Sequence, residues 1–135
     1  MLTISTRDNT AESITVTATD ANGKTGSLSL LINPAAASGD YRSAASGAWN
    51  SAATWQTNNG ASWVAASKPP TNSSAGIITV LSGHTVTNAA NVTVDQVVVQ
   101  SGGQVNVNSG VTLTLAAGTG TDLDVLGTLQ NAGTV

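Results

Sequence analysis

Residues 77–115 read IITVLSGHTVTNAANVTVDQVVVQSGGQVNVNSGVTLTL, and this stretch decides the fold. Apolar residues recur in it, and in the residues that follow, at fixed intervals. Val105 lies 19 residues after Val86, and Leu129 lies 24 residues after Val105. The same two intervals join a second set, which consists of Val92, Val111 and Val135. A fixed interval of this length indicates a repeated structural unit of three short strands.

Glycine marks the corners between these apolar segments, at Gly83, Gly102, Gly103, Gly110, Gly127 and Gly133. Short strands with glycine at the turns are typical of a parallel β-solenoid, in which each coil stacks on the one before. We therefore predict that residues 76–135 form about three coils of a parallel β-solenoid, within an all-β chain. The predicted apolar segments are Ile77–Leu81, Thr85–Thr87, Val92–Val94, Val97–Val99, Val105–Val107, Val111–Leu115, Leu123–Leu126, Thr128–Leu129 and the terminal Val135.

The composition fits a narrow core and excludes several classes of function. Of 135 residues, 40% are hydrophobic and 8% are charged, and the chain has neither Cys nor Phe. The four Lys and Arg residues, none of which follows Lys68, cannot neutralise a nucleic acid backbone. No apolar run is long enough to predict a membrane-spanning helix. Without cysteine, a disulfide framework and a thiolate metal site are excluded.

Residues 1–33 are predicted to form three antiparallel strands, and residues 34–40 a linker. Apolar and polar residues alternate in each strand, which indicates one buried and one solvated face. The strands are centred on Leu2 and Ile4, on Ile14 to Ala18, and on Leu28 to Ile32. Asn22-Gly23 predicts a hairpin turn between the last two, because these residues adopt positive φ angles at little cost.

Two segments carry family resemblances. The run Leu-Thr-Ile-Ser at 2–5, followed by Thr-Val-Thr-Ala-Thr-Asp-Ala-Asn-Gly-Lys-Thr at 15–25, resembles the C-terminal part of bacterial immunoglobulin-like surface domains. A complete sandwich of that kind needs about 100 residues, so the resemblance implies that 1–33 are only its last strands.

The second resemblance covers residues 41–135. Gly47-x-Trp49, Thr54-Trp55, Pro69-Pro70 and then Ile-x-Val-x-x-Gly-x-x-Val at 78–86 resemble the start of β-solenoid regions in large secreted bacterial surface proteins. The pattern is also similar to the extracellular domain family named for its eight glycines. The resemblance implies an extracellular repeat module with adhesive or ligand-binding roles and no catalytic residues.

Residues 41–75 contain all three tryptophans, Trp49, Trp55 and Trp63. We expect irregular structure with a short helical turn here, because the spacing of Trp49 and Trp55 fits neither a helix nor one face of a strand. The favoured interpretation is a cap that covers the apolar start of the first coil. The alternative is a carbohydrate-binding platform of exposed Trp residues, for which Trp63, in a polar loop, is the strongest candidate.

The acidic residues and the single histidine are weak candidates for chemistry. Asp20-x-Asn22-Gly23 resembles the opening of a calcium loop, but position twelve is Leu31 rather than Glu. Asp95, Asp122 and Asp124 could bind calcium, as in solenoid polysaccharide lyases, but such lyases also need a basic residue, and no Lys or Arg follows Lys68. Solvated carboxylates on the outer face are favoured. His84 has no acidic or thiolate neighbour that would complete a metal site, so we expect no enzyme activity, metal or cofactor.

The candidate assembly edges are Leu2, Ile4, Thr134 and Val135, because they belong to an incomplete sandwich and to an open last coil that neighbouring strands would complete. The predicted function is a non-enzymatic structural or adhesive module of a secreted, cell-surface protein or filament. Two alternatives remain within it: a passive stalk, and self-assembly by strand complementation. The expected partners are neighbouring copies, further domains of the same chain and surface glycans, but not nucleic acid.

Overall fold

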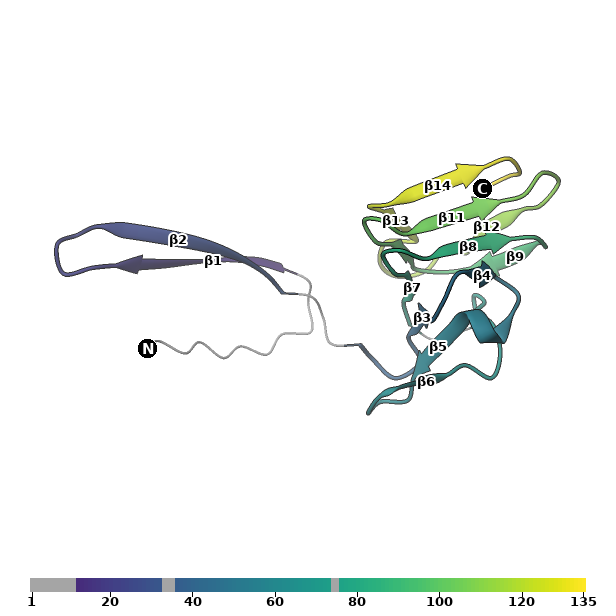
Figure 1. The fold of residues 1–135 in the computed structure, drawn as a ribbon, viewed down its shortest axis with the longest axis horizontal. Helices are drawn as coiled ribbons and strands as arrows, with labels where there is room; N and C mark the ends of the chain where they lie inside the picture. Colours follow the sequence, from purple (N-terminus) through teal and green to yellow (C-terminus); the bar gives the residue numbers. More distant parts are fainter. Residues whose placement is uncertain (1–11, 33–35, 74–75) are drawn as a thin grey trace. The chain divides into compact units, whose positions relative to one another are not determined.

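The computed structural model describes residues 12–32, 36–73 and 76–135, and these are all-β apart from one 3-10 turn, η1 (Ala52–Thr54). The chain forms two compact units, residues 1–36 and residues 37–135 (Figure 1). Each unit is described by itself below.

The first unit contains one antiparallel hairpin, β1 (Glu12–Thr19) and β2 (Thr25–Ile32), which pairs from Glu12↔Ile32 to Thr19↔Thr25. These are two of the three predicted strands; the third, with Leu2 and Ile4, lies outside the described residues. In the turn, the Gly23 N–H donates to the Asp20 carbonyl over 3.0 Å. Gly23 has a φ of +78° and Asn22 does not share this conformation, so the turn is longer than the tight two-residue form that the Asn-Gly pair favours.

The second unit contains twelve described strands. They are β3 (Tyr41–Ser43), β4 (Gly47–Ala48), β5 (Trp55–Asn58), β6 (Trp63–Ala65), β7 (Ile78–Val80), β8 (Thr85–Asn88), β9 (Val92–Val94), β10 (Val97–Val99), β11 (Gln104–Val107), β12 (Leu113–Leu115), β13 (Leu123–Val125) and β14 (Thr128–Asn131). The eight strands from β7 onward overlap the first eight segments predicted from the apolar pattern. The ninth predicted segment, at Val135, is not a strand, although the adjacent Thr134 forms an isolated bridge to Thr112.

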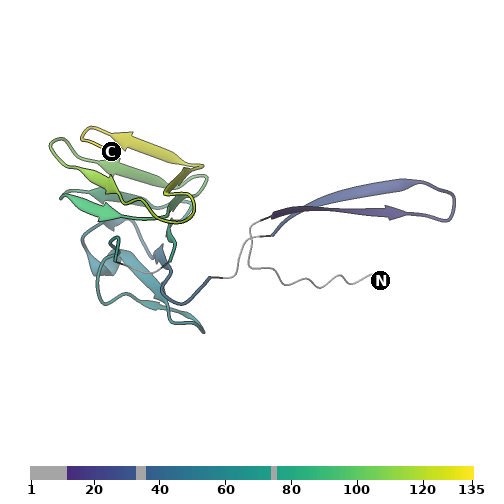
Figure 2. The same cartoon turned by 180° about the vertical axis from the view of Figure 1, so that it is seen from behind.

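These strands form three sheets that the chain visits in a fixed order. The six-stranded sheet has the order β13-β10-β7-β3-β5-β6, the four-stranded sheet β14-β11-β8-β4, and the two-stranded sheet β12-β9. We call each passage through the sheets a rung: β7–β8–β9, then β10–β11–β12, then β13–β14. The strands of successive rungs lie side by side in both views (Figures 1 and 2) and pair in parallel.

The predicted register is confirmed in the four-stranded sheet, where Val105 pairs with Val86 and with Leu129. In the two-stranded sheet the prediction is wrong: Val92 lies opposite Leu113 rather than Val111. The physical reason is the corner at 108–112, which contains two more residues than the corner at 89–91 between β8 and β9. Asn91 Oδ1 accepts a hydrogen bond of 2.8 Å from the Thr112 N–H and so holds the longer corner in place.

The segment predicted to be an irregular cap, residues 41–75, also supplies strands to the two larger sheets, next to the first rung. β3 pairs in parallel with β7, and β4 pairs in parallel with β8. β5 and β6 then pair antiparallel beyond β3, and β6 is the outermost strand of the six-stranded sheet on that side. The second unit also begins earlier than the expected end of the linker at residue 40, because Asp40 is 8% exposed and bonded within it.

Alternating side chains fill the interior between the sheets. In β7 and β10, Ile78, Val80, Val97 and Val99 are each at most 1% exposed, whereas the residues between them are half-buried. Valine fits this space because its branched side chain suits a pleated strand and occupies little depth. Val86, Val94, Val105, Val107 and Leu113 complete the valine and leucine core together with Trp49, Trp55 and Tyr41.

Candidate functional site

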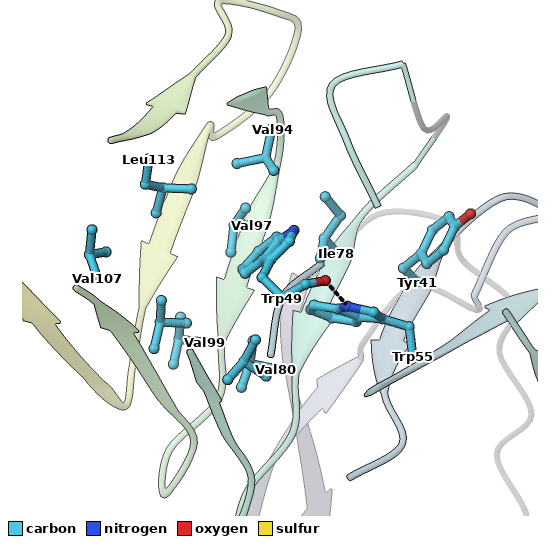
Figure 3. Packing of buried hydrophobic residues seen from close by; sticks show 12 residues of the cluster. Tyr41, Trp49, Trp55, Ile78, Val80, Val94, Val97, Val99, Val107 and Leu113 are labelled. Atoms are coloured by element: carbon cyan, nitrogen blue, oxygen red, sulfur yellow. Dashed lines mark hydrogen bonds between the residues drawn. The ribbon is translucent and has the colours of Figure 1, made fainter. Parts of the chain in front are cut away.

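Trp49 and Trp55 lie inside the core and not on its surface. Each is 1% exposed, and their ring centroids are 4.9 Å apart at an interplanar angle of 61°, an edge-to-face contact. Trp55 Nε1 donates to the Trp49 carbonyl over 2.8 Å (Figure 3), and Trp49 Nε1 donates to the Pro70 carbonyl over 3.1 Å. Both rings are thus buried and both indole N–H groups have a hydrogen-bond acceptor, as expected for a cap. A sugar platform that includes these two rings is excluded, because neither ring presents a face to solvent.

Trp63 differs from the other two tryptophans. It lies half-buried on β6, and Arg42 Cζ is 4.5 Å from its ring centroid. Arg42, on β3, also donates through Nε to Gln56 Oε1 on β5 over 2.9 Å. Three strands therefore bring a cation, an amide and an aromatic ring together on the six-stranded sheet. The sequence pattern did not reveal this group, because its members are 14 and 7 residues apart and meet only when their three strands pair.

The turn at Asp20 is built from internal hydrogen bonds. Asp20 Oδ1 accepts from the Asn22 and Lys24 N–H groups, each over 2.9 Å. That carboxylate oxygen stabilises the hairpin, which is the interpretation favoured over a calcium loop.

The other three carboxylates fit the favoured prediction of solvated, outward-facing groups only in part. Asp124 is exposed on β13, as expected, but Asp95 and Asp122 are half-buried, and each has an Oδ1 that is buried without a hydrogen bond in the described part of the chain. The loop at 116–122 covers Asp95 closely, since a Cβ at Gly118 would collide with the Asp95 carboxylate. Within the described ranges no group of three His, Asp or Glu side chains could hold a metal ion.

His84 takes part in a structural contact at the corner between β7 and β8. Its Nδ1 lies 2.8 Å from Ser43 Oγ, which also accepts the Leu81 N–H over 2.9 Å. Ser43 is fully buried, so a substrate cannot reach the hydroxyl. The pair joins β3 to the following rung and does not present a nucleophile.

The candidate assembly edges are only partly described. Leu2 and Ile4 lie outside the described residues. Thr134 forms a parallel bridge to Thr112, and its carbonyl accepts the Leu113 N–H over 2.9 Å, while Val135 is 45% exposed.

The last rung is open on one side. Val80, Val99 and Val125 occupy equivalent positions in paired strands, yet Val80 and Val99 are 0% exposed and Val125 is 38% exposed. Next to Val125, Leu126 is 65% exposed. β13 and β14 are the outermost strands of their sheets. We call the row formed by Val80, Val99 and Val125 the Val125 ladder. An unpaired strand edge at which such a row becomes exposed is a natural place for further strands to add.

An open groove of about 280 Å³ lies where β11 and β14 end, lined by Asn106, Val107, Asn108, Gln130, Asn131 and Ala132. Its polar side chains are amides, which can form hydrogen bonds but cannot serve as an acid or a base at neutral pH.

No protein-family model matches the sequence, and neither a curated protein nor a solved structure matches the chain. None of the helical structure in the described ranges is long and apolar enough to cross a membrane.

Proposed function

We propose that this chain is a non-enzymatic structural module of a secreted surface protein, a rod of parallel β-solenoid coils that is extended at the β13–β14 edge. The observation that carries the proposal is the loss of burial along one ladder, from Val80 and Val99 at 0% exposure to Val125 at 38%. A further coil, from more of the same chain or from a neighbouring copy, would cover this ladder and pair the free backbone groups.

The two sides of the stack differ, and this difference gives the rod a direction. On one side, β5 and β6 occupy the edge of β3, and Trp49 and Trp55 fill the interior. On the other side, the outer edges of β13 and β14 have no strand beside them in the described residues. The edge strand on the first side of the six-stranded sheet is β6, which pairs antiparallel with β5 and does not continue the parallel pattern of the rungs, and this favours growth from the β13–β14 edge.

A structural role is also supported by what the candidate chemical residues do. His84 and Ser43 join two rungs, Asp20 stabilises a turn, and Trp49 and Trp55 close the core. The resemblance of 41–135 to secreted surface β-solenoids, and of 1–33 to immunoglobulin-like surface domains, supports an extracellular location and an adhesive context.

The proposal predicts edge-dependent association of this chain. Sedimentation velocity over a range of concentrations should show self-association, because an apolar strand edge is available for pairing. Val125→Lys should weaken the association at least about tenfold, since a charge in the exposed ladder opposes strand addition. Gln130→Lys adds the same charge to β14 at an exposed position outside this ladder, and should leave the association unchanged.

A chain that stays monomeric while the backbone amides of β13 and β14 exchange rapidly would contradict extension of this edge by a neighbouring copy. Equal weakening by the two lysine variants would show that the association is not through the Val125 ladder.

Carbohydrate binding remains the second candidate function, and one observation favours it. Since Trp49 and Trp55 are buried, it rests on Trp63 and on the polar residues around that ring.

A further inference from the structure

We propose that Arg42, Gln56 and Trp63 form a binding site for a carboxylate-bearing sugar, such as a uronic acid unit of an acidic glycan. The site lies on the outer face of the six-stranded sheet. It goes beyond the structural role, which would stand unchanged if this site were absent.

The register places the three side chains on one face. Arg42 lies opposite Gln56 on the neighbouring strand, and Trp63 lies opposite Asn58, two residues further along β5. Residues two apart on a strand point to the same side, so Gln56 and the Trp63 position share a face. The neighbours of Arg42, Tyr41 and Ser43, are buried on the opposite face.

The guanidinium is held in place by two contacts. The Trp63 ring lies against it at 4.5 Å, and Gln56 Oε1 accepts from Nε at 2.9 Å. A cation over a tryptophan face is attracted by the ring electrons. Because these contacts use the ring-facing side and Nε, the terminal nitrogens stay available, and little side-chain freedom remains to be lost on binding.

No carboxylate in the described residues pairs with Arg42. Asp40 is near in sequence, but its two oxygens accept the Ile77 and Ala37 N–H groups. Along the row of paired positions that starts at Arg42 and continues through Thr79 and Val98, the first acid is Asp124. It is three strands away, about 14 Å at the usual strand spacing. A half-buried guanidinium without an acidic partner is suited to an anion supplied from outside.

The Trp63 indole can donate a hydrogen bond to a ligand, which the other two indoles cannot do. Trp49 Nε1 and Trp55 Nε1 each donate to a backbone carbonyl, whereas Trp63 Nε1 has no acceptor among the described residues. Its N–H and the uncovered part of its ring are available to a ligand.

These groups favour an acidic sugar over a simple anion. A guanidinium binds a carboxylate through two parallel hydrogen bonds. The aromatic surface can contact the C–H face of a pyranose ring, and Gln56 Nε2 and the Thr79 hydroxyl can bond to sugar hydroxyls. An anion without a ring would use only Arg42.

The test is a titration of the ¹⁵N-labelled chain with tetragalacturonate, followed by the three indole N–H resonances. The Trp63 resonance should shift with saturation, while those of Trp49 and Trp55 should not. A neutral galactose tetramer should bind at least about tenfold more weakly, because it lacks the carboxylate for Arg42.

Variants separate this site from general charge attraction. Arg42→Gln and Trp63→Leu should each lower the affinity about tenfold or more, and Lys68→Gln, which removes an exposed cation elsewhere in this unit, should leave it unchanged. Unaltered Trp49 and Trp55 resonances in the Arg42→Gln variant would show that the fold is retained.

Any one of the following results would overturn the proposal: no shift of the Trp63 resonance with tetragalacturonate, an equal loss of affinity in Lys68→Gln, or unchanged affinity in Arg42→Gln. A polyglutamate peptide that bound as tightly as tetragalacturonate would also overturn it, because the sugar ring would then contribute nothing.

Discussion

At the scale of single residues, Asp40 shows how one side chain can join distant parts of the chain. Its Oδ1 accepts the Ile77 N–H over 2.8 Å and its Oδ2 accepts the Ala37 N–H over 2.7 Å. The carboxylate packs against Gly76, where a Cβ would collide with it. Asp40 thereby ties the start of the second unit to the entry of β7, a role that its place next to a proline- and alanine-rich stretch did not indicate.

Asp40→Asn should destabilise the chain by about 2 kcal/mol, because an amide can accept only one of these two hydrogen bonds and turns an N–H towards the other donor. Urea unfolding monitored by circular dichroism measures the change. The matched control is Asp124→Asn, at an exposed position, which should cost less than about 0.5 kcal/mol. Equal costs for the two variants would show that the buried hydrogen bonds of Asp40 contribute no stability.

At the scale of strands, residues at equivalent positions in successive rungs differ in burial, because their burial depends on whether a neighbouring rung covers them. Val99 lies between Val80 and Val125, and it is 0% exposed because a strand covers it on both sides. Gly127 shows how tightly the rungs approach at the corners, since a Cβ there would collide with the Gln100 and Gly103 carbonyls of the preceding rung. Only glycine allows this approach.

Val99→Ala should destabilise the chain by about 2 kcal/mol, because it removes two buried methyl groups and leaves a cavity between rungs. Val125→Ala removes the same groups from the open rung and should cost less than half as much. Thermal or urea unfolding of both variants measures the difference. Similar costs would indicate that Val125 is covered in solution, in which case the edge is already occupied under the conditions used.

At the scale of the whole molecule, the chain divides into two compact units. In the part of the chain that the structure describes, Trp49, Trp55 and the buried valines form a core within residues 37–135. The described part of the first unit is a two-stranded hairpin, and a hairpin of that size is at best marginally stable on its own.

Residues 37–135, expressed without 1–36, should therefore fold with a Tm within about 3 °C of that of the full chain. A peptide of residues 12–32 should be largely unstructured in water by circular dichroism. Failure of 37–135 to fold, or a much lower Tm, would mean that the first unit contributes to the core of the second.

The sequence by itself determined the strands from residue 76 onward and the register of one sheet. Side chains on a strand alternate with a period of two, so Val86, Val105 and Leu129 can all face the interior only in a narrow range of registers. The strands of the hairpin at 12–32 followed from the same alternation and from turn chemistry, both of which are local.

Tertiary structure decided the features that depend on which distant segments of the chain pair as strands. The longer corner at 108–112 moved the partner of Val92 to Leu113, and a segment without periodicity supplied β3 and β4 as the first strands of the stack. The group formed by Arg42, Gln56 and Trp63 arises in the same way. Its members come from the three neighbouring strands β3, β5 and β6, and strand pairing of this kind leaves no periodic signal along the chain.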